Sequence, residues 1–147
     1  MITVKRLSIE DARIILEGAQ QKSQEIGVPM CTAVVDESGN LVAFERLDGG
    51  KVTSISIAID KAFTAAGARR PTRFYRDNSQ PGKPTWGIQG TNDGRFTVIP
   101  GGLPVEVEGM IVGGVGCSTG TADEDEEVAK AAIDYFFAQT SVRTGAG

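Results

Sequence analysis

The 147-residue sequence predicts a single domain of the α+β class, with elements in the order helix, two strands, helix, loop, three strands, helix. The strongest observation is the glycine-rich stretch 99–127, which joins a tight turn, a β-hairpin and the start of a helix. A second hairpin is predicted over residues 30–46. A chain of this length can bury roughly 70% of its unfolded surface, enough for a core of its own.

The composition is that of an ordinary globular protein, with 40% hydrophobic and 23% charged residues. No apolar run approaches the roughly 18 residues that cross a bilayer, so we expect no membrane segment. The N-terminus lacks the pattern of a secretory signal, and we therefore expect the cytoplasm. The net charge of −4 argues against nucleic acid as a partner.

Histidine is absent, which removes the commonest general base and the commonest metal ligand together. Cys31 and Cys117 both fall inside predicted strands, and we expect two reduced, packed thiols. The acidic run 123–127 is explained by helix capping and the helix dipole, so we predict no metal site there.

In the first half of the chain, Ser8 is the predicted N-cap of a helix that ends near Gly27 and has its apolar positions at helical spacing. Strands are predicted at 30–35 and 41–46 on either side of a turn. An alanine- and isoleucine-rich helix over 54–68 then packs on the sheet.

In the second half, residues 72–94 are irregular except for a short helix expected at 72–78, with Trp86 as the one large aromatic anchor. A fifth strand is predicted at 95–99, before the hairpin. In the hairpin of the stretch 99–127, the second strand contains several glycines, which allow another backbone or a ligand to approach closely. A helix over 123–139 closes the domain at 1–140, and 141–147 form a flexible tail.

Four segments carry a family resemblance: ERLDG (45–49), SIAIDKA (56–62), PGGLPV (100–105) and GMIVGGVGCSTGTADEDEEVA (109–129). With them the chain resembles the GlcG/HbpS family of haem-binding-like proteins, which includes the C-terminal domain of PduO corrinoid adenosyltransferases and OrfY. The resemblance implies a profilin-like or PAS-like five-stranded antiparallel sheet, a homo-oligomer such as an octamer, and a haem or corrinoid ligand. It also implies a place in a catabolic operon.

Arg46, Asp48 and Lys61 match recurrent positions of that family, and Arg46 with Lys61 could clamp a carboxylate. The alternative is an ion pair of Asp48 with either of them. We expect Lys61 to lie solvated at the helix flank, the alternative being a pocket-facing ammonium. The backbone N–H groups of Gly101 and Gly102 could hold an anion, or the two residues form a plain turn.

Glu106 and Glu108 lie two apart on a predicted strand and so share a face, which suits either paired acid–base carboxylates or a solvated strand surface. Haem would need an axial ligand other than histidine. The candidates are Met30, Met110, Cys31, Cys117, Tyr75 and Tyr135.

Two functions follow from these observations. The first is a small-ligand-binding protein whose ligand lies between the helix 54–68, the loop at Gly101 and Gly102, and the segment around Trp86. The alternative is a catabolic isomerase, lyase or hydrolase that acts on a small carboxylated or carbonyl compound. It would use Lys61 or a carboxylate such as Glu106 as base, and Arg46 as substrate anchor.

Overall fold

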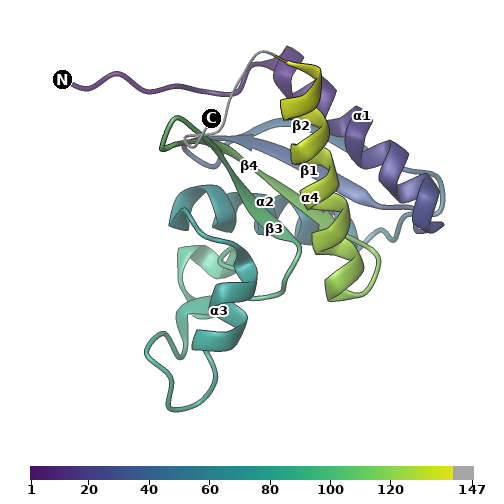
Figure 1. Ribbon diagram of the computed structural model, residues 1–147. Coiled ribbons are helices and arrows are strands. Elements are labelled where there is room, and N and C mark those ends of the chain that lie inside the picture. Colours follow the sequence, from purple (N-terminus) through teal and green to yellow (C-terminus); the bar gives the residue numbers. More distant parts are fainter. Residues whose placement is uncertain (141–147) are drawn as a thin grey trace.

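The structure is a computed structural model that describes residues 1–140, so the predicted tail at 141–147 lies outside the described residues. It is a mixed α+β domain in which four helices accompany an antiparallel sheet of four strands within this range (Figure 1). The helices are α1 (Ile9–Ile26), α2 (Ser54–Ala68), α3 (Thr72–Asn78) and α4 (Ala122–Gln139). The strands are β1 (Cys31–Asp36), β2 (Leu41–Arg46), β3 (Gly102–Val107) and β4 (Met110–Ser118).

The strands lie side by side in the order β2-β1-β4-β3, and helices cover both faces of the sheet. On one face α1 and α4 pack together over a large core that includes Ile15, Val34, Val115 and Phe136. On the other face α2 packs alone against β1, β3 and β4 through small residues. No helix among residues 1–140 is long and apolar enough to span a bilayer.

Side-chain capping explains where α1 and α4 begin. Ser8 accepts the N–H of Asp11 and the Asp11 carboxylate accepts the N–H of Ser8, which is a capping box. Thr121 and Glu124 form the same reciprocal pair at the start of α4. The predicted cap of the first helix, Ser8, is confirmed.

The glycines of β4 bring α2 unusually close to the sheet. A Cβ at Gly116 would lie 2.1 Å from the Ala58 carbonyl oxygen, and one at Gly114 would lie 2.7 Å from that of Ala62. Only hydrogen at these positions leaves room for the helix backbone, so the predicted close approach is confirmed and the approaching group is α2.

The predicted fifth strand at 95–99 is wrong. A side chain of α2 holds this segment: the Thr64 hydroxyl accepts the Thr97 N–H (3.0 Å). Its own proton is directed to the Asp60 carbonyl oxygen within the helix (2.8 Å), with the Arg95 carbonyl oxygen at 3.3 Å. Phe96 is buried, and Tyr75 meets its ring edge-on. The segment is therefore held through a backbone N–H and a buried apolar residue, without a strand partner.

The chain from α3 to residue 99 projects away from the sheet (Figure 1). Trp86 lies in this projection with 66% of its surface exposed, so the prediction that it anchors the irregular segment is wrong. The short helix at 72–78 is confirmed.

Candidate functional site

Lys61 lies on the face of α2 that packs against the sheet, and only 1% of its surface is exposed. The expected solvated position is therefore wrong. The side chain points inward because α2 packs directly on β4. At Gly116 the helix and the strand are so close that Cβ of Lys61 would lie 3.0 Å from an added Cβ.

The ammonium of Lys61 is held by two acceptors from the far end of the chain. Its Nζ lies 2.8 Å from the Cys117 carbonyl oxygen and 2.8 Å from Oδ2 of Asp125, which is itself 3% exposed. Oδ1 of Asp125 accepts the Gly120 N–H at 2.9 Å. Both carboxylate oxygens thus accept hydrogen bonds, as suits an ionised group. Burial raises the pKa of Asp125, and the ammonium of Lys61 opposes that shift.

Gly101 and Gly102 close this arrangement, which we call the Lys61 centre (Lys61, Asp125, Cys117, Gly101 and Gly102). Gly101 has φ +127°, and a Cβ there would lie 2.8 Å from Nζ of Lys61. The Gly101 carbonyl oxygen accepts the Cys117 N–H at 2.9 Å.

The N–H of Gly102 donates to the buried hydroxyl of Thr72 at 3.0 Å. The sequence-predicted residues Lys61, Gly101 and Gly102 do meet. The space between them is filled by protein, and the Gly102 N–H already has an acceptor.

Arg46 and Asp48 lie elsewhere, exposed at the end of β2 and in the loop after it. The partner of Lys61 is Asp125, and within residues 1–140 neither Arg46 nor Asp48 forms an ion pair. The predicted ion pairs of Asp48 with Lys61 and with Arg46 are therefore wrong.

Glu106 and Glu108 are both exposed, and Glu108 lies in the turn after β3, where it pairs with Lys5. Glu106 is four residues along β3 from Gly102, roughly 13 Å at about 3.3 Å per residue. The structure therefore does not bring Glu106, Arg46 and Lys61 together.

Each side chain of the acidic run at the start of α4 has a partner within the protein. Arg73 pairs with Asp123 and Glu126, whereas Glu124 completes the capping box. Among residues 1–140 no three His, Cys, Asp or Glu side chains group in a way that could hold a metal ion.

The two cysteines lie on neighbouring strands, where Cys31 pairs in register with Ser118 and Thr32 with Cys117. They are therefore offset by one residue and face opposite sides of the sheet. Both are buried free thiols, as expected. Burial raises the pKa of Cys117 to about 12, so this thiol stays protonated at neutral pH.

Of the six candidate axial ligands, Met110 lines an open hollow, whereas three are fully buried and the two tyrosines pack against neighbouring residues. Met30, Cys31 and Cys117 have no exposed surface, Tyr75 packs edge-on against Phe74 and Phe96, and Tyr135 packs against Gly18. Met110 begins β4 and is 38% exposed. Its hollow, which we call the Met110 hollow, has a volume of about 460 Å³. It is lined by Ile2, Thr3, Val4, Lys5, Glu37, Ala66, Gly67, Arg69, Gly109, Met110 and Ile111.

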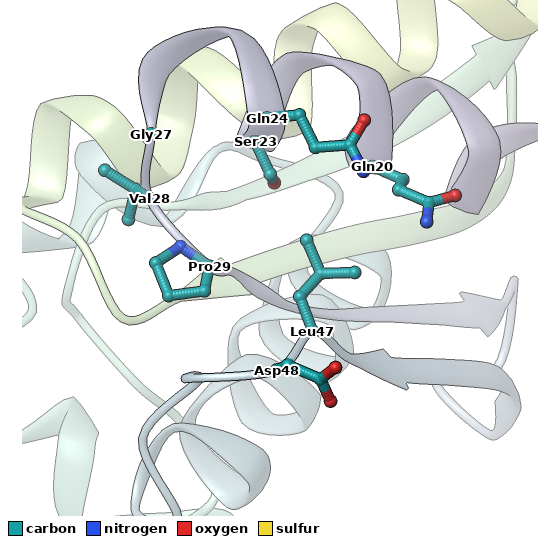
Figure 2. A pocket seen from close by; sticks show the side chains of 8 residues that line it. All are labelled: Gln20, Ser23, Gln24, Gly27, Val28, Pro29, Leu47 and Asp48. Carbon is teal, nitrogen blue, oxygen red and sulfur yellow. The ribbon is translucent and has the colours of Figure 1, made fainter.

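A second hollow of about 440 Å³ lies under the C-terminal end of α1 (Figure 2). We call it the α1 hollow; its lining is Gln20, Ser23, Gln24, Gly27, Val28, Pro29, Leu47 and Asp48. Asp48 is the only sequence-predicted site residue in it. Sequence reasoning missed the hollow, although one signal was present: Ser23 puts a hydroxyl at an apolar position of the helix pattern.

Known proteins are similar to this chain over nearly the whole domain. Over 133 residues the chain is 37% identical to the 15.0 kDa protein of the dhaT–dhaS intergenic region of Citrobacter freundii, covering 90% of this chain and 94% of that one. Its fold matches the crystal structure of the Klebsiella pneumoniae protein ORFY with a TM-score of 0.93 and 32% identity, covering 95% of this chain and 97% of that chain.

A haem complex also has this fold: the crystal structure of PduOC with haem matches with a TM-score of 0.86 and 27% identity, covering 95% and 98% of the two chains. The corrinoid adenosyltransferase PduO of Salmonella typhimurium is 28% identical, and the chain spans 38% of its length. The family model described as haem degrading protein HbpS-like matches residues 7–134. The chain therefore belongs to the HbpS-like family, as the sequence motifs indicated.

Proposed function

We propose that this protein binds a tetrapyrrole of the haem or corrinoid class in the Met110 hollow. The observation that carries the proposal is the position of Met110, because this candidate ligand of the metal is 38% exposed and lines an open hollow of about 460 Å³. A methionine thioether is an established axial ligand of haem iron. Relatives support the ligand class, since PduOC is described in complex with haem and PduO as a corrinoid adenosyltransferase.

The walls of the Met110 hollow suit a flat apolar ring that carries carboxylates at its edge. Ile2 and Val4 are exposed apolar side chains beside Met110, at 90% and 53% of their surface. Exposed apolar groups gathered at one hollow mark a ligand or partner surface. Arg69 forms no ion pair within residues 1–140 and is available for a propionate.

The residues that line the Met110 hollow therefore fit a tetrapyrrole. Met110 would hold the metal from one side, Ile2, Val4 and Ile111 would cover the ring, and Arg69 would pair with a carboxylate. When bound, such a group supplies a redox-active or ligand-exchanging metal.

The proposal includes a cytoplasmic homo-oligomer, of which an octamer is the predicted form, encoded with a catabolic pathway. The profilin-like or PAS-like class of the sheet also stays a prediction.

The first experiment is a titration of the purified protein with haem and with cobinamide, followed by absorption spectroscopy and native mass spectrometry. We expect saturable binding, and we expect Met110→Leu to weaken it at least tenfold and to change the spectrum of the bound metal. Lys83→Gln, an exposed change on the projecting segment away from the hollow, is the control and should bind as the original chain does. Equal spectra and affinities for Met110→Leu would remove Met110 from the site.

The catalytic roles of Lys61, Arg46 and Glu106 stay predictions of the alternative function. The binding function is favoured over this alternative because the three side chains do not converge and the Lys61 ammonium already has two acceptors. The alternative is tested by screening small carboxylated and carbonyl compounds as substrates. Turnover that Lys61→Ala abolishes without loss of assembly would support it.

A further inference from the structure

The α1 hollow contains the only buried side-chain polar atom among residues 1–140 that has no hydrogen-bond partner, the hydroxyl oxygen of Ser23. Ser23 is 2% exposed and lies on the inner face of α1. Figure 2 shows its hydroxyl directed from α1 toward the wall formed by Pro29 and Leu47. A helical serine commonly bonds the carbonyl four residues before it, and buried polar groups are nearly always paired. This unpaired hydroxyl therefore points to an external partner.

The charges around the α1 hollow define what that partner can be. Asp48 contributes a carboxylate, which only accepts hydrogen bonds when ionised, and it forms no ion pair within the described chain. The C-terminal end of α1 adds the negative end of the helix dipole, and no basic residue lies in its last turn. No lysine or arginine lines the hollow, so its potential disfavours anions such as carboxylates and phosphates.

The remaining lining supplies both hydrogen-bonding and apolar surface. Gln20 and Gln24 extend from α1 on one side, and the Asp48 carboxylate lies on the other side (Figure 2). Amide oxygens, a hydroxyl and a carboxylate together match the three N–H donors of a primary ammonium group. Val28 and Leu47 leave apolar surface beside them for a short carbon chain. A neighbouring hollow shares Gly27, Val28 and Pro29 with the α1 hollow. Its lining contains one basic and one acidic side chain, Lys51 and Glu124, so it adds no net charge to the α1 hollow.

We propose that the α1 hollow binds a small organic amine as its ammonium ion, with Asp48 as counter-charge and the Ser23 hydroxyl as a buried acceptor. This site is separate from the Met110 hollow, shares no lining residue with it and does not depend on tetrapyrrole binding.

The test uses three probes that share a four-carbon chain: butylamine, 1-butanol and butyrate. Each is titrated into ¹⁵N-labelled protein at neutral pH, and the backbone amide shifts of residues 20–29 and 47–48 are followed by NMR. We expect saturable shifts with butylamine alone. Equal binding of 1-butanol would show that charge is not recognised and would overturn the ammonium assignment, as would the absence of saturable shifts with butylamine.

Variants locate the binding within the hollow. Asp48→Asn should weaken butylamine binding at least tenfold, and Ser23→Ala about threefold or more. Asp93→Asn removes an exposed carboxylate on the projecting segment, at a positive φ that asparagine tolerates, and should leave binding unchanged. Unchanged affinity in Asp48→Asn would also overturn the proposal. The NMR spectra themselves show whether each variant is folded, and a failure of tetrapyrrole binding leaves this result untouched.

Discussion

The Lys61 centre and the α1 hollow both place polar groups inside the protein, but they satisfy them in opposite ways. In the Lys61 centre the ammonium and both oxygens of Asp125 are hydrogen-bonded within the chain, and glycines remove any remaining space. In the α1 hollow a buried hydroxyl has no partner among residues 1–140, and the carboxylate of Asp48 has no cation. A site that is complete stabilises a fold, whereas a site with unmet hydrogen bonds is suited to a ligand.

This comparison predicts that the Lys61 centre is far more sensitive to substitution. Asp125→Ala should lower the free energy of unfolding by about 3–5 kcal/mol, because it leaves a buried ammonium without a counter-charge. Chemical denaturation measures the loss. The double variant Lys61→Met with Asp125→Ala should lose less than Asp125→Ala alone. Asp123→Ala, in an exposed pair with Arg73, is the control and should cost at most about 1 kcal/mol.

Close packing of α2 on β4, next to the Lys61 centre, is a second feature that can be broken. Gly116→Ala places a Cβ 2.1 Å from the Ala58 carbonyl oxygen, so α2 must shift. We expect a loss of about 3 kcal/mol, at the upper end for an overpacked site, in the same denaturation assay. Gly90→Ala has open space around it and should change stability by less than about 0.5 kcal/mol. Equal effects at the two positions would contradict the packing argument.

Thr72 carries the paired hydroxyl that contrasts with the unpaired one of Ser23. Thr72→Val keeps the shape of the side chain but leaves the Gly102 N–H buried without an acceptor. The expected loss is about 1–3 kcal/mol in thermal or chemical unfolding. Thr72→Ser restores the acceptor and should recover part of the loss; if it is no more stable than Thr72→Val, the hydrogen bond is not the cause.

Ser23→Ala should have the smallest effect, and one of opposite sign. It removes a buried hydroxyl that makes no hydrogen bond within residues 1–140 and adds a better helix former, so we expect unchanged stability or a gain of up to about 1 kcal/mol. The measurement is the unfolding midpoint without added amine. A loss above 1 kcal/mol would mean that Ser23 has a stabilising partner and would weaken the contrast between the two regions.

Much of the fold could be predicted because the responsible interactions are local. Capping residues, turn glycines and helical spacing located α1, α2 and α4, and the two hairpins followed from turn signals beside alternating or apolar runs. The length of the connection after α2 predicted α3. The segment at 95–99 has the composition of a strand, but one of its backbone N–H groups, that of Thr97, is bonded by Thr64, some thirty residues away along the chain. Composition carries no information about that competitor.

The candidate site was harder to predict, because its determinants are distant in sequence. The residues by themselves determined the family, the α+β class, the absence of histidine and the need for small residues along β4. Only the tertiary structure decided that Lys61 points inward to Asp125, 64 positions away, and that Asp48 lies exposed at the edge of the α1 hollow instead. The physical reason is that the orientation of a charged side chain depends on which partner the folded chain brings within a few ångströms, whereas caps, turns and periodicity act between near neighbours.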